Sequence, residues 1–254
     1  MKKLLFIILV VVLLFWFVSS RNLDYKFVIS NLIEKDQLQQ PGDLKFKAYL
    51  LTLVPIAEAT IGVPKEEDFK GKQVYHLTAT GKNLDYLSKL FNAYAIFDSY
   101  MERANFNVLE YKEKIVITGK QDLYREAVYD QKKLTITVAG TSRQIFPNTQ
   151  DHLSLIANIR RMDLDKAKNI EFNVNTNQKN YIFEGTVEPK DILIKGKTYR
   201  IYIVKSTIRR KDKNPYHKSK VDIVLLKNGS DNTPVLIKIL AGGFLNSAKL
   251  TEIK

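Results

Sequence analysis

The stretch Leu44-Lys-Phe-Lys-Ala-Tyr-Leu50 decides the fold, because apolar and polar residues alternate along it. Leu44, Phe46 and Leu50 share one face of an extended chain, and this period of two is typical of a half-buried β-strand. The chain is therefore expected to be mainly β. Similar segments recur at residues 57–63, 73–80, 93–103, 114–119, 123–129, 134–139, 170–174, 181–187, 198–206, 221–227, 235–241 and 244–253.

Turn residues separate many of these segments. Lys195-Gly196-Lys197, Asn228-Gly229-Ser230 and Gly242-Gly243 each stand between two alternating runs. Closely spaced strands joined by short turns indicate an antiparallel sheet or barrel, because parallel strands need a long crossover connection.

Two stretches break the alternation and have apolar residues at helical spacing, residues 83–91 and residues 150–162. For the second, Asn148 or Thr149 is a plausible N-cap, with Asp151 in the first turn. We expect one or two short helices of this kind to plug or flank the sheet. The predicted fold is a curved antiparallel sheet or half-open β-barrel.

The composition excludes several classes of site. The chain has 254 residues and no cysteine, which rules out disulfides, thiolate metal sites and cysteine nucleophiles. Its formal net charge of +13 suggests an anionic partner, such as anionic lipid or an acidic polymer, or else serves solubility. For an exported protein, lipid and envelope polymer are more natural partners than nucleic acid, so no nucleic-acid partner is expected.

The N-terminus has the pattern of an export segment. Lys2 and Lys3 precede an unbroken apolar run at residues 4–18, followed by Ser19 and Ser20. A helix of this length spans about 22 Å, short of the roughly 30 Å hydrocarbon core of a bilayer. The length favours a cleaved signal peptide over residues 1–20, while the bulky end of the run leaves a retained inner-membrane anchor open.

These patterns divide the chain into three parts. Residues 1–20 are the signal peptide or anchor, and residues 21–41 are a tether, in which Phe27, Ile29, Leu32 and Ile33 line a short helix that ends before Pro41. Residues 42–254 are a single β-rich envelope domain. The expected location is the periplasm or cell envelope.

Six segments of the chain form an ordered set of short motifs: Val54-Pro-Ile-Ala-Glu-Ala-Thr60, Gly71-Lys-Gln-Val-Tyr-His-Leu-Thr-Ala-Thr80, Phe97-Asp-Ser-Tyr100, Tyr124-Arg-Glu-Ala-Val-Tyr-Asp130, Thr149-Gln-Asp-His-Leu-Ser-Leu-Ile-Ala-Asn-Ile-Arg160 and Thr233-Pro-Val-Leu-Ile237. In this order they resemble the bacterial exported proteins grouped as domain of unknown function 3108. The strongest of the six is the one from Thr149 to Arg160, with its Gln-Asp pair, its Leu-Ser pair and a helix that ends in Arg. The resemblance implies an envelope protein with a curved antiparallel sheet, like the half-open barrels of lipoprotein carriers. It implies no activity and no cofactor.

The residue types that carry catalysis form no recognisable motif. No two of the three histidines, His76, His152 and His217, have metal-ligand spacing, so neither a metal site nor a cofactor is expected. Asp98-Ser99 lacks a nucleophile elbow. Asp151 and Arg160 are 2.5 helical turns apart and should not meet. No catalytic residue is therefore assigned.

One segment is strongly basic, at residues 205–220. It is expected to be a turn between two strands, and its cations are candidates for binding an anionic ligand or membrane surface. A solvated edge loop, whose lysines discourage sheet-to-sheet pairing, is the alternative. The candidate residues are Lys205, Arg209, Arg210, Lys211, Lys213, Lys218 and Lys220.

Three functions remain open. The first is a non-enzymatic module that binds a lipid or another amphipathic ligand on the concave face of the sheet. The second is a membrane-tethered structural or assembly protein that binds another envelope component. The third is a hydrolase. A deep apolar pocket would favour the first, an exposed apolar patch without a pocket the second, and convergent Asp, His, Ser or Glu side chains in a cleft the third.

Overall fold

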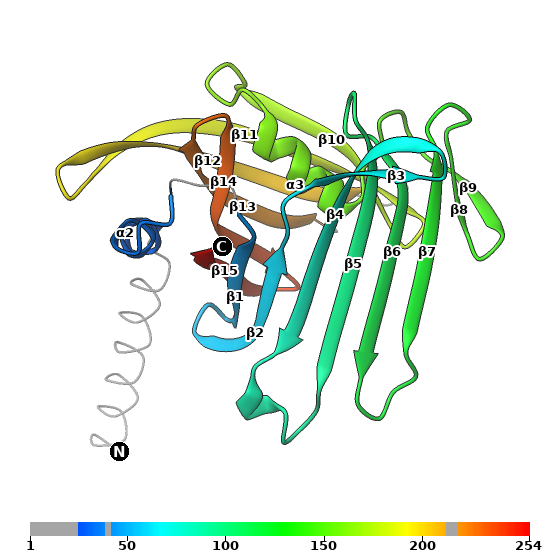
Figure 1. The fold of residues 1–254 in the computed structure, drawn as a ribbon, viewed down its shortest axis with the longest axis horizontal. Helices are drawn as coiled ribbons and strands as arrows, with labels where there is room; N and C mark the ends of the chain where they lie inside the picture. The colour runs from blue at the N-terminus through cyan, green and yellow to red at the C-terminus, as the bar shows by residue number, and fades with distance from the viewer. Residues whose placement is uncertain (1–24, 39–41, 212–217) are drawn as a thin grey trace.

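The computed structural model describes residues 25–38, 42–211 and 218–254 (Figure 1). The predicted signal or anchor segment (1–20), Lys213 and His217 lie outside these residues. None of the described helices is long and apolar enough to cross a membrane.

A single antiparallel sheet dominates the fold, as the alternating pattern predicts. The strand order is β10-β11-β12-β13-β14-β15-β1-β2-β4-β5-β6-β7-β8-β9, with β3 paired beside β4. Almost all neighbours are consecutive hairpins, and the exceptions are β1, which pairs with the last strand, β15, and β2, which pairs with β4. The bounds are β1 Leu44–Leu50, β2 Val54–Ile61, β3 Lys65–Phe69, β4 Lys72–Asn83, β5 Ala93–Glu102, β6 Val108–Ile117, β7 Leu123–Asp130, β8 Thr135–Val138, β9 Thr141–Gln144, β10 Asn169–Thr176, β11 Lys179–Ile194, β12 Lys197–Arg210, β13 Lys218–Asn228, β14 Asp231–Ala241 and β15 Phe244–Ile253.

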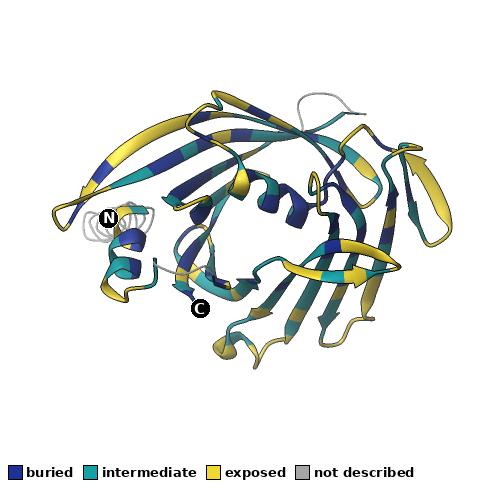
Figure 2. Cartoon of the chain, turned by 45° about the horizontal axis from the view of Figure 1, so that its top comes forward, coloured by how far each residue is buried: buried dark blue, intermediate teal, exposed yellow. Residues whose placement is uncertain are grey.

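The sheet curls into a barrel that is not closed (Figure 2). Its two ends, β9 and β10, are not paired with each other as a ladder. Side chains from the β10–β11 turn and the start of β11 reach β9 instead: Asn180 Nδ2 donates to Gln144 O at 2.9 Å, and Gln178 Nε2 donates to Thr141 O at 3.0 Å. Residue Gln150 forms an isolated parallel bridge with Val174. The prediction of a half-open barrel is confirmed.

Helix α3, His152–Arg161, lies on the concave side of this barrel (Figure 2). Its Leu155 and Ile159 pack in one hydrophobic cluster with Tyr202 and Val204 of β12. The helix therefore fills part of the barrel, as the prediction of a plug for residues 150–162 requires.

Helix α2, Tyr25–Glu34, falls in the segment assigned to a tether and packs against β14 and β15. Its Ile29 and Leu32 belong to the same hydrophobic cluster as Ile201 of β12. The same cluster also contains Leu153 and Ala157 of α3, so the two helices share part of one hydrophobic core. Phe27, which the sequence pattern placed on the apolar face of this helix, is instead exposed.

Several local predictions were wrong. Residues 83–91 contain only a single 3₁₀ turn, η1 (Asp85–Leu87), in an otherwise irregular connection. Strands β3 and β9 were missed because their residues are mostly charged or polar and half-buried or exposed, so they have no apolar alternation. Strand β11 extends well beyond the predicted residues 181–187: residues 188–191 are polar or proline and exposed, which interrupts the alternation, but Ile192 and Ile194 beyond them are buried.

Candidate functional site

A pocket opens at the end of the barrel where α3 terminates. It has a volume of about 440 Å³ and lies between the last turn of α3, the start of β1 and the hairpin between β5 and β6. Apolar side chains form much of its wall, among them Leu44, Leu77, Phe106, Ala157 and Ile253. We refer to this cavity as the α3 pocket.

Two adjacent arginines stand at the α3 pocket, and only one of them is neutralised. Arg160 makes a two-pronged ion pair with Asp231, with Nε–Oδ1 and Nη2–Oδ2 distances of 3.1 and 2.9 Å. The exposed Arg161 instead places its guanidinium 3.9 Å from the ring centroid of Phe106. Among the described residues it has no carboxylate partner. The pocket thus combines an apolar wall with one available cation.

Asp151 holds the first turn of α3. It is the N-cap, and its carboxylate accepts hydrogen bonds from the backbone N–H groups of Leu153 and Ser154 at 2.7 and 2.8 Å. Ser99 Oγ of β5 also donates to it, at 2.6 Å. The prediction of Asn148 or Thr149 as N-cap was wrong, because only Asp151 has an extended backbone directly before the helix and a side chain that reaches its N–H groups.

Burial dominates the ionisation of Asp151. The residue is 1% exposed, and burial raises the pKa of its carboxyl above the usual range even though His152, Ser99 and the capping N–H groups favour the charged form. Its hydrogen bonds bind α3 to β5 across the inside of the barrel. Asp151 and Ser99 therefore position α3, and neither residue lines the α3 pocket.

The last turn of α3 is fixed by strand β14. Buried Asn232 donates from Nδ2 to the carbonyl oxygen of Met162 at 2.7 Å and of Ile159 at 3.4 Å. The neighbouring Asp231 binds Arg160. These contacts satisfy carbonyl groups that a helix end leaves without partners, and they hold Arg161 at the mouth of the α3 pocket.

A second polar group lies on the concave side near the start of α3. Tyr111 donates from its hydroxyl to Glu113 at 3.0 Å and lies 2.9 Å from His152 Nε2, and Glu113 is 2.6 Å from Arg125. Burial, together with the nearby Glu113 carboxylate, raises the pKa of Tyr111 well above its usual value. The phenol of Tyr111 therefore stays protonated and donates its hydrogen bond to Glu113, so the contact serves to hold the structure.

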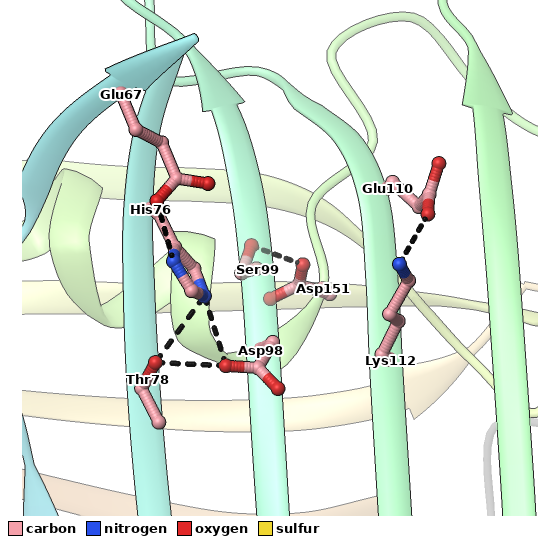
Figure 3. Close-up of polar contacts among 8 residues, drawn as sticks. All are labelled: Glu67, His76, Thr78, Asp98, Ser99, Glu110, Lys112 and Asp151. Atoms are coloured by element: carbon pink, nitrogen blue, oxygen red, sulfur yellow. Dashed lines mark hydrogen bonds and ion pairs between the residues drawn. The ribbon is translucent and has the colours of Figure 1, made fainter. Parts of the chain in front are cut away.

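The outer face of β3, β4 and β5 carries a third polar group, centred on His76 (Figure 3). Its Nδ1 lies 3.1 Å from Glu67 and its Nε2 lies 2.9 Å from Asp98. Thr78 Oγ1 donates to Asp98 at 2.7 Å. The ring of His76 stacks on Tyr100, with centroids 4.4 Å apart. The spacing of the histidines in the sequence gave no sign of the two carboxylate neighbours of His76.

Beside His76, the side chain of Glu110 is buried between lysines. Lys112 lies 3.0 Å from it, and Lys70 also pairs with it. Burial opposes the ionisation of Glu110, but the two lysines outweigh burial and lower its pKa. Lys112 also lies over the rings of Phe69 and Tyr100, which stack on each other. The outer group therefore fastens β3 to β6.

Two hydroxyls in these polar groups, those of Thr78 and Ser99, donate to carboxylates. Nucleophilic catalysis needs a hydroxyl whose proton passes to a base. Thr78 lies 3.2 Å from His76 but donates to Asp98, and Ser99 donates to Asp151 on the opposite face of the sheet (Figure 3). Neither hydroxyl lines the α3 pocket. Within the described residues, no group of three or more His, Asp or Glu is arranged to hold a metal ion.

The basic segment at residues 205–220 occupies the ends of β12 and β13, with carboxylates beside it. Lys205 lies 2.8 Å from Glu188, and Arg209 lies 3.1 Å from Glu184. Lys211 donates to Asn173 and lies over the ring of Phe146. Arg210 is half-buried, Lys220 is exposed, and only the backbone of Lys218 is described. The carboxylates reduce the net charge that this segment offers to an anion.

The sequence matches the family described as protein of unknown function (DUF3108) over residues 45–244. The chain belongs to this family. The family assignment confirms the resemblance seen in the sequence. No protein in the comparison with curated proteins matches the chain.

Two solved structures match the chain at low sequence identity. A beta-barrel-like protein of domain of unknown function DUF1849 from Brucella abortus superimposes with a TM-score of 0.54 and 10% sequence identity, covering 84% of this chain and 97% of that chain. A protein described as a putative lipoprotein from Parabacteroides distasonis matches with a TM-score of 0.33 and 9% identity, over 85% of this chain and 96% of the other. At such low identity the first match supports the fold alone.

The geometry explains the segment that carries the strongest family resemblance, Thr149 to Arg160. Gln150 bridges to β10, Asp151 caps α3, and Arg160 binds Asp231. Each of these three residues positions α3 within the barrel. The segment with the strongest family resemblance therefore holds the residues that insert α3 into the barrel. The α3 pocket lies at the C-terminal end of this helix.

Proposed function

We propose that this member of the DUF3108 family is a non-enzymatic envelope module that binds an amphipathic anion in the α3 pocket. The ligand class is a molecule with an apolar chain and a carboxylate or phosphate head, such as a fatty acid or a lipid. The observation that carries the proposal is the combination of an apolar wall with the available guanidinium of Arg161.

The size and lining of the α3 pocket support this ligand class. A volume of 440 Å³ falls in the range of about 300–1,000 Å³ that small-molecule sites occupy. Leu44, Leu77 and Phe106 offer the apolar contact that favours transfer of a hydrocarbon chain from water. The concave face is partly filled by α3, so the ligand enters at the end of the barrel instead of spanning its interior.

The charge at the mouth supports an anionic head. A guanidinium presents parallel N–H groups that match the oxygens of a carboxylate or a phosphate. Arg161 stacks on Phe106, which orients its plane before a ligand arrives. Arg160 is already paired with Asp231, so its charge is occupied. We assign the head group to Arg161.

The proposed location follows from the sequence. The apolar run at residues 4–18, with two lysines before it, favours export through the inner membrane, whether or not the run is later removed. In the envelope, acyl chains with anionic heads are abundant ligands for such a pocket. The rival function, an assembly protein, predicts an apolar patch without a pocket, and the α3 pocket favours binding over it.

The test is native mass spectrometry, with lipid extraction, of the full-length protein purified from a bacterial envelope. A lipid or fatty acid at near-unit stoichiometry is expected. Arg161→Gln should lose the anionic ligand, and Val63→Phe, which narrows the pocket wall, should lose it irrespective of head group. Arg143→Gln alters an exposed arginine of β9, far from the pocket, and should retain it. A ligand-free mass under gentle conditions, or equal retention in all variants, overturns the proposal.

A further inference from the structure

The end of the barrel opposite the α3 pocket carries exposed apolar side chains on its turns. Three connections meet there: β1 to β2, β4 to β5 and β6 to β7, drawn at the lower ends of the strands in Figure 1. Leu90 is the most exposed of these side chains, at 80%. We call this set the apolar rim: Leu51, Val54, Leu90, Phe91, Leu123 and Tyr124.

The connections of the apolar rim are joined to one another. The backbone N–H of Leu84 donates to Ile56 O at 3.1 Å, which ties the β4–β5 connection to β2. Thr118 and Asn92 tie the same connection to the β6–β7 turn, with a backbone N–H···O distance of 2.8 Å. The rim is therefore one surface and not three independent loops.

Lysines surround the apolar rim. Lys82, Lys89, Lys114 and Lys120 lie in or beside the same connections and are all exposed. None of the four has an ion-pair partner within the described part of the chain. The β4–β5 and β6–β7 connections themselves hold two lysines, Lys89 and Lys120, and two acids, Asp85 and Asp122, and Lys82 and Lys114 on the flanking strands β4 and β6 add two further cations.

We propose that the apolar rim docks on the surface of an anionic lipid bilayer. Exposed apolar side chains in a contiguous patch mark an interaction surface. Leucine, phenylalanine and tyrosine side chains on protruding turns enter the interface between headgroups and acyl chains, while the lysines around them meet anionic headgroups. This surface differs from the basic segment at residues 205–220, whose Lys205 and Arg209 lie beside carboxylates.

Docking in this orientation has a consequence for the α3 pocket. The rim and the pocket lie at opposite ends of the strands, because Leu44 at the start of β1 lines the pocket while Leu51 follows its end. The pocket mouth would then point away from the bilayer. The docking surface stands on separate observations and does not depend on what the pocket binds.

The absence of cysteine makes a site-specific test possible in the full chain. A single cysteine at Leu90→Cys carries an environment-sensitive fluorophore at the rim. The control variant, Val128→Cys, carries the same fluorophore on the outer face of β7. Position 128 is four residues from Tyr124 on the same face and about 13 Å further along the strand. Both proteins are added to vesicles of phosphatidylglycerol and phosphatidylcholine with or without nitroxide-labelled lipid.

The fluorophore at position 90 should shift to shorter wavelength and be quenched by the nitroxide lipid, and the one at position 128 should do neither. Replacing the four lysines by Glu should weaken the quenching at position 90 on anionic vesicles. An equal response at both positions would mean that another part of the chain holds the protein on the vesicle, and it would overturn the proposal. A shift at position 90 that grows with protein concentration and needs no vesicles would assign the rim to a second copy of the chain.

Discussion

Two neighbouring residues of β5 make hydrogen bonds on opposite faces of the sheet, one buried and one partly exposed. Ser99 points into the barrel and donates to Asp151, and both residues are almost completely buried. Asp98 points outward to His76 and Thr78, where about a quarter of its side chain remains exposed. The hydrogen-bond lengths are similar, so burial decides what each contact is worth. Inside, a lost partner leaves a polar group without water, whereas outside water replaces it.

The inner contact should therefore be the more expensive one to remove. Asp151→Ala deletes the N-cap of α3 and leaves Ser99 and two backbone N–H groups without an acceptor, and it should cost about 3 kcal/mol of unfolding free energy. Asp98→Ala on the outer face should cost about 1 kcal/mol. Urea unfolding at neutral pH measures both. Equal losses would mean that burial does not separate the two groups.

The far end of α3 offers a second inner contact. Arg160 has a side chain that is 11% exposed, and Asp231→Ala would leave its charge without a partner. We expect a loss of about 2 kcal/mol by the same measurement, less than for a fully buried pair because Asp231 itself is about one-third exposed. Asp231→Asn retains one acceptor and should lose less. A negligible effect of the alanine variant would show that water reaches Arg160.

The pH dependence of the unfolding free energy should also distinguish Glu110, on the outer face of the sheet, from Asp151, inside the barrel. The pKa of Glu110 is lowered, so the folded state binds this proton less tightly than the unfolded chain, whose glutamate pKa is about 4.3. Its contribution is present above that value and is lost as the pH falls through the lowered folded pKa. The pKa of Asp151 is raised by burial, so the folded state binds that proton more tightly, and stability falls as the pH rises through the raised pKa.

Two neutral variants separate these effects. The loss of unfolding free energy caused by Glu110→Gln should become smaller as the pH is lowered. The loss caused by Asp151→Asn should become larger. Unfolding free energies of both variants and of the unmodified protein, measured from about pH 3 to pH 8, supply the comparison. Curves that change in the same direction would contradict the assignment of opposite pKa shifts.

The smallest effect is expected in the basic segment. Lys205 and Glu188 are each more than half exposed, so Glu188→Ala should change the unfolding free energy by less than about 0.5 kcal/mol. The same variant unmasks a cation, so it should strengthen binding to anionic vesicles if residues 205–220 touch them. Unchanged vesicle binding would leave the apolar rim as the docking surface.

Local patterns were sufficient for most of the strands and for α3. The alternation in Leu44–Leu50 and the glycines of the hairpin turns predict strands and antiparallel pairing because both signals depend on a few adjacent residues. They failed where residues are polar on both faces, as in β9, and where apolar spacing in an exposed connection imitated a helix, at residues 83–91. The sequence signal for the pocket is the Arg160-Arg161 pair at the end of the helix, and the pattern of residues does not indicate that Arg161 is the one that faces the pocket without an ion-pair partner among the described residues.

The sequence by itself determined a mainly β chain with an inserted helix, membership of its family and a net positive charge. Only the tertiary structure decided which of those residues meet. Ser99 contacts Asp151, which is 52 positions away in the sequence, and Arg160 contacts Asp231, which is 71 positions away. The face that each residue occupies follows from the local period of the strand, but its partner follows from the curvature that brings distant strands around α3. The pairing of β1 with β15 joins the two halves of the chain into that one curved sheet, and the pocket at its end has an apolar wall beside Arg161.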